Sequence, residues 1–265
     1  MSHKTDVVVI GAGPVSLFAV FELGLLNLKC HLIDNLDKIG GQCAELYPEK
    51  PVYDIPSRSK ITGEELIGEL MLQAKPFEPV FHLNQQADSI KKVGDEWKLT
   101  TSSNTIIQAR CIVIAAGAGS FVPRRLPIKN IELFENTSVF YSVRDKSKFK
   151  NKKILIVGGG DSALDWTNDL ASIADVTLMH RRKEFRASPD SVTKMLELEK
   201  NNKIKFVYGQ LDSLSGNEKN LNAVKYKHED EEFSIEVDYL LPFFGLKMEL
   251  GPIANWGINL HENLI

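Results

Sequence analysis

Two short glycine-rich segments have the residue types that bind phosphate groups. The first, "GAGP", places Gly11 and Gly13 directly after the apolar run "VVVI", and the second, "GGGDS", places Gly158 and Gly160 directly after "ILIV". In such a turn the first glycine permits a sharp bend, and the second lets the backbone approach a pyrophosphate. The helix that follows points free N–H groups and its positive dipole end at the same phosphates. Each segment therefore predicts a strand, a phosphate-binding turn and a helix.

The first turn is followed by an acid. Asp34 ends the segment "KCHLIDN", about 20 residues after the turn, where a carboxylate can accept hydrogen bonds from a ribose diol. Ser16 stands at the third position of the turn, which usually carries glycine or alanine, and this is a departure from the pattern. Together these features predict a dinucleotide site. The alternative is a βαβ unit whose glycines serve only packing.

The second turn is followed by basic residues. Its third position is Ala163, and the segment "HRRKEFR" at the end of the next predicted strand contains His180, Arg181, Arg182 and Arg186. A carboxylate would repel a 2′-phosphate, whereas an arginine fork pairs with it. This turn therefore predicts binding of NADPH rather than NADH. The alternative is a basic strand end that is simply solvated.

The two turns together predict electron transfer between two bound cofactors. A chain with an acid after one turn and arginines after the other can hold FAD and NADPH, and hydride then passes from the nicotinamide to the flavin. The cofactors carry this chemistry, so no catalytic side chain is predicted. Cys30, Cys43 and Cys111 form no C-x-x-C pair, and no Cys/His cluster has zinc spacing, so no metal site is predicted either.

The elements that must position these residues repeat one plan in two halves: a βαβ unit, an insert of meandering strands and a closing strand. The first half is predicted to contain strands at 6–10 and 29–35, helices at 14–25 and 63–77, a long loop at 36–63, a meander at 85–109 and a closing strand at 111–117. The second half is predicted to contain strands at 152–157 and 175–182, a helix at 188–202 and meandering strands over 203–216, 221–230 and 231–245. The predicted fold class is α/β, with two Rossmann-like three-layer dinucleotide-binding domains, each with a β-meander insert.

Composition narrows the kinds of partner that we expect. The 265 residues are 43 % hydrophobic, which is enough for one large core or two modest ones. The 32 basic and 35 acidic side chains give a net charge of −3, so neither nucleic acid nor a membrane surface is an expected partner. Apolar runs are shorter than the ~20 residues of a membrane helix, and the first predicted strand begins too early for a signal peptide. We therefore expect a cytoplasmic protein.

Seven segments resemble one family. They are "GAGP", "GGQCAELYPEKPVYDIP", "ITGEEL", "AAGAGSFVPR", "VGGGDSALDW", "HRRKEFRAS" and "PFFGLKMELGPIANWG". These segments are similar to the thioredoxin-reductase-like ferredoxin–NADP⁺ reductases, and the likeness covers essentially the whole chain. The resemblance implies a homodimeric flavoprotein that passes electrons from NADPH through FAD to ferredoxin or flavodoxin, reversibly in principle.

The resemblance also implies which residues bind the cofactors. The FAD set is Gly11, Gly13, Pro14, Ser16, Asp34, Gln42, Tyr47, Ala87 and Phe121. The NADPH set is Gly158, Gly160, Asp161 and Ser162, with His180, Arg181, Arg182 and Arg186 at the 2′-phosphate. Tyr47 is implied to lie against the isoalloxazine, whereas the residues alone favour an aromatic that anchors its loop. The implied FAD-binding domain is 1–121 plus 246–265, and the NADPH-binding domain is 122–245.

Cysteine positions separate this chain from two related families. Thioredoxin reductases have a C-x-x-C ahead of the second turn, where this chain has "FYSVRDKSKF". Glutathione-reductase-like enzymes have a cysteine pair of which Cys43 matches the first member, but Pro48 stands at the second. Without a redox disulfide, electrons are expected to leave the flavin directly for a one-electron carrier. The first alternative is an FAD/NADPH reductase of another small acceptor.

The second alternative concerns the final segment, "NWGINLHENLI". The family's chains continue beyond it with a Gly-Asp motif at the flavin, the last strand of the FAD sheet and a helix near the flavin. We therefore expect the 265-residue chain to bind NADP⁺ but to hold FAD weakly. In the extreme, it is a truncated NADP-binding module without working flavin.

Overall fold

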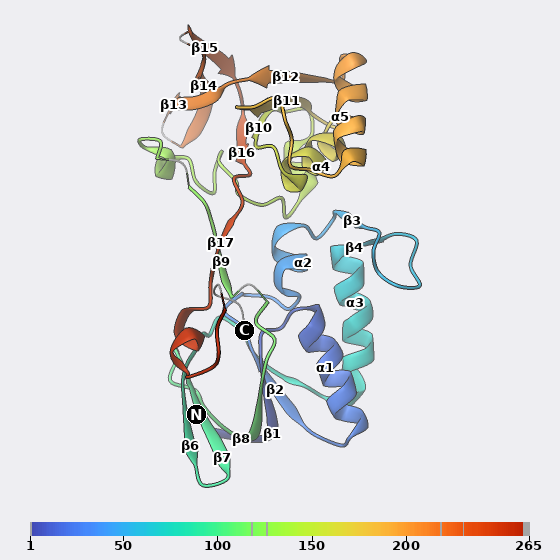
Figure 1. The fold of residues 1–265 in the computed structure, drawn as a ribbon, viewed down its shortest axis with the longest axis vertical. Coiled ribbons are helices and arrows are strands. Elements are labelled where there is room, and N and C mark those ends of the chain that lie inside the picture. Colours follow the sequence, from blue (N-terminus) through green and yellow to red (C-terminus); the bar gives the residue numbers. More distant parts are fainter. Residues whose placement is uncertain (1, 118, 126, 218, 230, 262–265) are drawn as a thin grey trace. The chain divides into compact units, whose positions relative to one another are not determined.

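The computed structural model describes residues 2–117, 119–125, 127–217, 219–229 and 231–261. The chain divides into two compact units (Figure 1). The first unit is Met1–Val122 with Met248–Ile265, and the second is Pro123–Lys247. Each unit has its own sheet built on parallel strands, which in the first unit is extended by an antiparallel pair, and its own hydrophobic core.

The first unit is built on a six-stranded sheet with the strand order β5-β2-β1-β8-β7-β6. Its parallel strands are β1 (Ser2–Ile10), β2 (Cys30–Ile33), β5 (Val80–His82) and β8 (Ile106–Ile114). An antiparallel pair, β6 (Ala87–Val93) and β7 (Glu96–Thr101), extends the sheet beyond β8. The predicted division into a meander at 85–109 and a separate strand at 111–117 is wrong. One continuous strand, β8, pairs with β7 in its first half and with β1 along its whole length.

Helices cover one face of this sheet. α1 (Pro14–Leu25) and α3 (Gly63–Ala74) lie side by side on it, and η1 (Lys75–Phe77) continues α3 (Figure 1). Val9 and Leu32 of the sheet pack here with Val20 of α1. The opposite face carries residues such as Ile10, and η4 (Gly251–Asn255) packs against it through Ile253. The first unit is thus a helix layer, a sheet and a partial third layer.

The predicted long loop at 36–63 contains short elements. α2 (Gly41–Leu46) follows the first turn of this loop, and β3 (Pro51–Val52) pairs with β4 (Ile61–Thr62) in an antiparallel hairpin. Thr62 also caps α3, because its hydroxyl accepts from the Glu65 N–H at 3.2 Å while the Glu65 carboxylate accepts from the Thr62 N–H at 2.8 Å. The end of the loop is therefore fixed to the start of α3.

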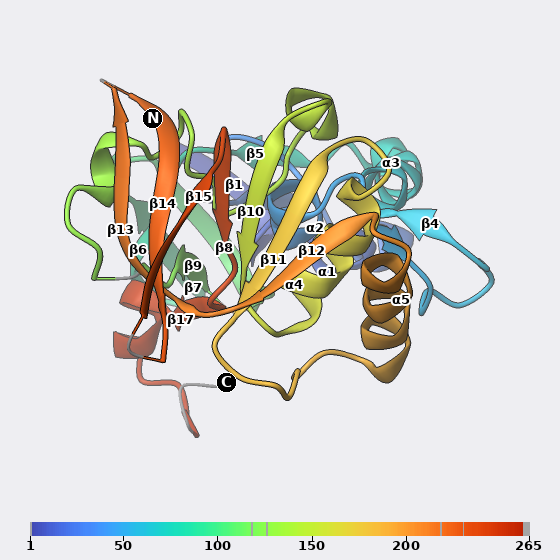
Figure 2. The ribbon, with the colours of Figure 1, turned by 90° about the horizontal axis from the view of Figure 1, so that it is seen from above.

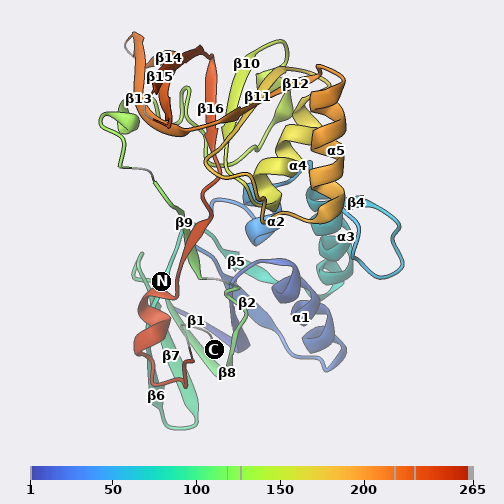
Figure 3. The ribbon, with the colours of Figure 1, turned by 45° about the horizontal axis from the view of Figure 1, so that its top comes forward.

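The chain enters and leaves the second unit through a two-stranded ribbon of β9 (Ser120–Pro123) and β17 (Leu246–Glu249). The second unit contains a four-stranded parallel sheet in the order β12-β11-β10-β16. These strands are β10 (Lys153–Val157), β11 (Asp175–His180), β12 (Ile204–Tyr208) and β16 (Tyr239–Pro242). Figure 3 shows α4 (Asp161–Leu170) and α5 (Pro189–Lys200) together on one face of this sheet. Short 3-10 turns are η2 (Ile131–Leu133) and η3 (Lys146–Phe149).

A three-stranded antiparallel sheet lies on the side away from α5 (Figure 2). Its strands are β13 (Gln210–Asn217), β14 (Asn220–His228) and β15 (Glu231–Glu236). The core between the two sheets includes Leu155, Met179, Leu211 and Val224. The predicted single strands at 203–216 and 231–245 each divide into two, because the chain leaves one sheet and enters the other at Gly209 and again after β15.

The predicted fold class is confirmed, since each unit has a Rossmann-like parallel sheet with helices on one face and meandering strands as an insert. Within the described ranges, no helix has both the length and the hydrophobicity that crossing a membrane requires.

Candidate functional site

The first glycine turn is closed on one side and open on the other. Gly11 has a φ of +102°, and a Cβ at this position would lie 2.5 Å from the carbonyl oxygen of Ala115, just beyond β8. Gly13 precedes α1, and a Cβ there would meet only the Cα of Gly41, at 4.0 Å. On the side that faces Ala115, only glycine fits at position 11. On the other side, at Gly13, no side chain covers the backbone, and we call this open backbone surface the cradle.

α1 presents an uncapped N-terminus to this cradle. In the described chain, no side chain caps the helix, and its first turn contains no acidic residue. Pro14 occupies the first helical position, where a missing N–H needs no partner. Free N–H groups and the positive end of the helix dipole favour an anion at this point.

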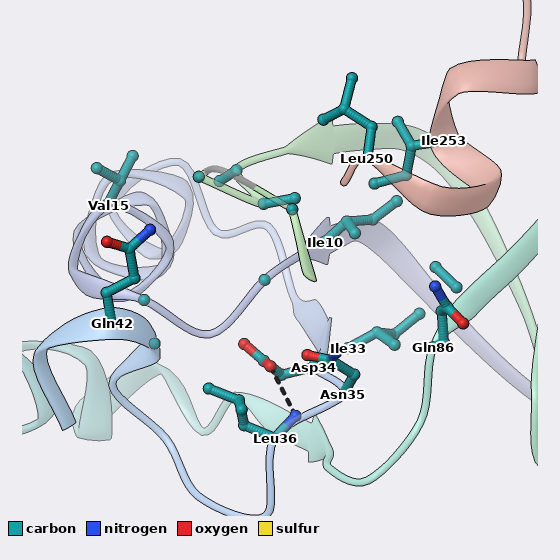
Figure 4. A pocket seen from close by; sticks show the side chains of 18 of the residues that line it. Ile10, Val15, Ile33, Asp34, Asn35, Leu36, Gln42, Gln86, Leu250 and Ile253 are labelled. Atoms are coloured by element: carbon teal, nitrogen blue, oxygen red, sulfur yellow. Dashed lines mark hydrogen bonds between the residues drawn. The ribbon is translucent and has the colours of Figure 1, made fainter. Parts of the chain in front are cut away.

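Asp34 lies beside the turn, as the sequence predicted, and both of its carboxylate oxygens are engaged. One oxygen accepts from the Ala12 N–H at 2.7 Å and the other from the Leu36 N–H at 2.9 Å, a bond drawn in Figure 4. A carboxylate has about four acceptor positions, so two remain for a ligand. The acid therefore fixes the turn to the end of β2 and can still accept hydrogen bonds.

A cavity of about 470 Å³ opens beside the turn, a volume typical of small-molecule sites. In Figure 4, Val15 and Gln42 lie on one side of it, and Leu250 and Ile253 lie on the other. The predicted residues that line it are Gly11, Gly13, Pro14, Asp34, Gln42, Tyr47 and Ala87. All the lining residues belong to the first unit.

Sequence reasoning missed part of this lining. The missed residues include Gln85, Gln86, Ala115, Ala116, Gly117, Leu250, Pro252 and Ile253. A signal for 115–117 was present, because these residues end the predicted strand 111–117 and ligands bind outside the carboxyl ends of parallel strands. No local pattern marked Leu250 and Ile253 as cavity residues, and only the family resemblance of "PFFGLKMELGPIANWG" implied that this segment belongs to the FAD-binding domain.

Two predicted flavin contacts differ from the rest. Ser16 is fully buried, and its hydroxyl donates to the carbonyl oxygen of Ala115 at 3.5 Å, so its side chain packs α1 against the end of β8 and does not line the cavity. This explains how serine replaces the usual third glycine of the turn. Phe121 belongs to β9, and its side chain lies outside the described part of the structure.

Tyr47 and Cys43 form one wall of the cavity. The Sγ of Cys43 lies 3.9 Å from the Tyr47 Oη, and burial raises the pKa of Tyr47 to about 12 and also raises the pKa of Cys43. Both groups are therefore neutral at physiological pH. All three cysteines are free thiols.

The second glycine turn repeats the design of the first. A Cβ at Gly158 would lie 2.5 Å from the carbonyl oxygen of Phe243, which follows β16, so this side is closed. Gly160 precedes α4, and a Cβ there would meet no atom within 4 Å among the described residues other than its own chain neighbours. Asp161 begins the helix and accepts from the Ser188 N–H at 2.7 Å, while Ser162 is exposed. The open side is again a cradle at a helix N-terminus.

The basic segment folds back onto this second turn. The Arg186 N–H donates to the Gly159 carbonyl at 2.7 Å, whereas the side chains of Arg181 and Arg182 are exposed. The ring of His180 covers Gly159, where a Cβ would lie 2.3 Å from it. Burial lowers the pKa of His180, and the two arginines lower it further. His180 is thus a neutral packing group, unlike the exposed arginines with which the sequence grouped it.

Comparison with known proteins gives consistent results. The model of the pyridine nucleotide-disulphide oxidoreductase family matches residues 5–264. The chain is 55% identical over 264 residues to a ferredoxin–NADP reductase of Parvibaculum lavamentivorans, covering 98% of this chain and 77% of that one. It is 53% identical over 261 residues to a ferredoxin–NADP reductase of Rickettsia rickettsii, covering 97% of this chain and 77% of that one.

Solved structures show the same architecture. A thioredoxin reductase of Lactococcus lactis superposes with a TM-score of 0.81 at 26% identity, covering 96% of this chain and 82% of that one. The thioredoxin reductase of T. acidophilum superposes with a TM-score of 0.83 at 22% identity, covering 98% of this chain and 83% of that one.

Proposed function

This chain belongs to the pyridine nucleotide-disulphide oxidoreductase family, and on that basis we propose that it is a flavoprotein that passes electrons from NADPH through FAD to ferredoxin. One observation carries the proposal. Each unit has an open glycine cradle at an uncapped helix N-terminus, and the first is accompanied by an acid while the second is accompanied by exposed arginines. Two such sites fit two different dinucleotides.

We assign FAD to the first unit. Its cradle at Gly13 and the N-terminus of α1 fit a pyrophosphate, and Asp34 fits a ribose diol. The neutral ring of Tyr47 at the cavity wall fits a planar aromatic ring. The full FAD set is Gly11, Gly13, Pro14, Ser16, Asp34, Gln42, Tyr47, Ala87 and Phe121, with Ser16 acting by packing α1. When bound, FAD takes a hydride from NADPH and passes the electrons on.

We assign NADPH to the second unit. Gly158 and Gly160 give the N-terminus of α4 access to the pyrophosphate, next to Asp161 and Ser162. Arg181 and Arg182 are exposed beside this turn and fit a 2′-phosphate through charge-assisted hydrogen bonds. The remaining members of the set are His180 and Arg186, which shape the backbone around the turn. The residues of this set bind and orient NADPH, and none of them is required to transfer a proton.

The electron acceptor follows from the cysteines and from the relatives. Cys30 is buried in the sheet and Cys111 is exposed on β8, so Cys43 stands alone among the cavity lining and has no cysteine partner there. Electrons then leave for a one-electron carrier, and the names of the relatives supply ferredoxin. The resemblance seen in the sequence supports flavodoxin as a second acceptor and a homodimer, and the short apolar runs of the sequence support a cytoplasmic location.

The test is an anaerobic assay of the chain with added FAD, NADPH and ferredoxin. We expect NADPH-dependent reduction of ferredoxin that is faster than the reaction with NADH. Reduction of dyes or quinones without reduction of ferredoxin would favour a reductase of another small acceptor. Binding of NADP⁺ without any flavin reduction would favour an NADP-binding module.

A further inference from the structure

The segment 181–188, here called the arginine loop, connects β11 to α5 and is tied to the second glycine turn by backbone contacts. The Arg186 N–H donates to the Gly159 carbonyl at 2.7 Å, and the Ser188 N–H donates to the Asp161 carboxylate at 2.7 Å. These bonds fix the end of the loop. Neither bond involves the first half of the loop, which contains Arg181 and Arg182, so other contacts must fix that half.

A stack of aromatic rings holds that first half. The rings of His180 and Phe185 are stacked, with centroids 5.3 Å apart and an interplanar angle of 25°. Phe185 packs in turn on Phe206 of β12 at 5.5 Å, and Phe206 packs on Tyr208 at 4.6 Å. The Nε2 of His180 also lies 3.3 Å from the Glu184 carbonyl oxygen, which closes the loop on itself. Phe185 therefore packs across the paired strands β11 and β12, against His180 of one and Phe206 of the other.

His180 connects this stack to the glycine turn. Its ring covers Gly159, where a Cβ would lie 2.3 Å away. Burial lowers the pKa of His180, so the ring is neutral when it packs on Phe185. A shift of Phe185 would therefore move His180, and with it the start of the arginine loop.

The arginines have no such support of their own. Arg181 and Arg182 are exposed, and among the described residues neither forms an ion pair with a carboxylate. Long side chains lose conformational entropy when they bind a ligand, and that loss is smaller when their backbone is already fixed.

We propose that Phe185 and His180 are positioning residues that set the selectivity for a 2′-phosphate by holding the arginine loop against the second glycine turn. The proposal rests on the assignment of NADPH to the second unit. The pyrophosphate is bound by the turn and by α4 in every dinucleotide, whereas only the 2′-phosphate needs the arginines. Loosening the contacts of Phe185 therefore weakens the binding of ligands that carry a 2′-phosphate and leaves the binding of ligands without it unchanged.

The experiment is calorimetric titration of the whole chain with 2′,5′-ADP and, separately, with 5′-AMP, which differs from it only in lacking the 2′-phosphate. We expect Phe185→Ala to weaken the binding of 2′,5′-ADP about 10-fold, through lost preorganisation of the loop, and to change 5′-AMP binding less than twofold. Phe185→Tyr keeps the ring and should restore binding. The matched control is Phe233→Ala, because Phe233 is stacked on Tyr226 with the same 5.3 Å between centroids but lies on β15, outside the arginine loop.

Other outcomes separate this proposal from the one on which it rests. If Arg182→Ala weakens 2′,5′-ADP but Phe185→Ala does not, the positioning role is wrong and the NADPH site stands. If Arg182→Ala has no effect, the NADPH site itself is wrong. Equal weakening of both ligands by Phe185→Ala would show a role in folding and overturn the selectivity role. Should Phe185→Ala unfold, Phe185→Leu keeps the apolar volume without the ring stack and must show the same selective loss.

Discussion

The carboxylate of Asp34 accepts a hydrogen bond of 2.7 Å from the backbone N–H of Ala12, which joins the end of β2 to the middle of the first glycine turn. The other oxygen accepts from the Leu36 N–H at 2.9 Å. The acid that faces a ribose in the proposed FAD site is thus also the group that holds the turn in shape. Binding and local structure depend on the same side chain.

Asp34→Asn should therefore weaken FAD binding by more than the loss of the ribose contact alone would. The amide keeps one acceptor oxygen, but its NH₂ group faces a backbone N–H and cannot accept from it. Loss of one charge-assisted hydrogen bond corresponds to about 10- to 150-fold weaker binding. Fluorescence titration with FAD measures this, and Asp95→Asn, at the exposed turn between β6 and β7, is the control. Unchanged FAD affinity in Asp34→Asn would remove Asp34 from the site.

Local patterns in the sequence predicted those parts of the fold that depend on local structure. The helix at Pro14–Leu25, both glycine turns and Asp34 lie where the spacing predicted them. Each of these has a local sequence signature, such as Pro14 at the first helical position, although distant residues such as Ala115 complete the packing of the first turn.

The sequence failed where distant pairing decides the outcome. β8 runs without a break because β1 pairs with it from Ser2 to Ile10, a contact that no local pattern reveals. The same holds at Gly209, where the chain leaves the parallel sheet because a second sheet is available to receive it. Leu250 and Ile253 line the cavity because the chain returns to the first unit after the whole second unit, a return that the family resemblance implied but no local pattern revealed.

Alanine substitutions at Gly158 and Gly160 of the second turn should have separate effects, the first on stability and the second on NADP⁺ binding. Gly158→Ala places a Cβ 2.5 Å from the Phe243 carbonyl oxygen, so it should destabilise the second unit by roughly 1–3 kcal/mol. Gly160→Ala meets no atom within 4 Å, so its unfolding midpoint should stay near that of the parent. Its methyl group fills the cradle proposed for the pyrophosphate and should abolish tight NADP⁺ binding. Thermal unfolding and NADP⁺ titration of both variants check this, and normal NADP⁺ affinity in Gly160→Ala would contradict the site.

Arg182→Ala should change coenzyme preference. A charge-assisted hydrogen bond to the 2′-phosphate contributes about 1.5–3 kcal/mol, which corresponds to about 10- to 150-fold weaker NADPH binding. NADH lacks that phosphate, so its affinity should stay nearly the same. Titration with both coenzymes measures the ratio, and Lys152→Ala, an exposed cation ahead of β10, is the control. An equal loss for NADPH and NADH would show that Arg182 does not contact the phosphate.

Removing the thiols should spare electron transfer. Cys30, Cys43 and Cys111 are all free, and burial raises the pKa of Cys30 to about 11 and also that of Cys43, so neither is a ready thiolate nucleophile. The triple variant with Cys30→Ala, Cys43→Ser and Cys111→Ser should keep NADPH-dependent reduction of an acceptor in the presence of FAD. It should lose some stability, because Cys30 packs in the core. A folded triple variant that binds FAD but cannot reduce any acceptor would reveal a thiol mechanism.

The first unit should become less stable as the pH falls from about 6.5 towards 4, because of three histidines on neighbouring strands. His3, His31 and His82 have ring centroids 5.0 to 5.5 Å apart, and the Nδ1 of His31 lies 3.0 Å from the Nε2 of His82. One of these nitrogens must donate and the other accept, so a proton added to the accepting nitrogen breaks the bond. Burial, and then the other two rings, lower the pKa of His31 from 6.5 to about 4, and burial and His3 lower the pKa of His82.

The sign of the effect follows from these lowered values. In the unfolded chain His31 and His82 take up protons near pH 6.5, so the unfolded state binds more protons between pH 6.5 and 4 and stability falls through that window. His31→Gln cannot take up a proton, and its urea midpoint should depend less on pH there than that of the parent. His228→Gln, on β14 of the second unit, should keep the parent's pH dependence. A His31→Gln variant with an unchanged pH profile would show that the histidine cluster does not govern acid stability, since no other change separates the two proteins.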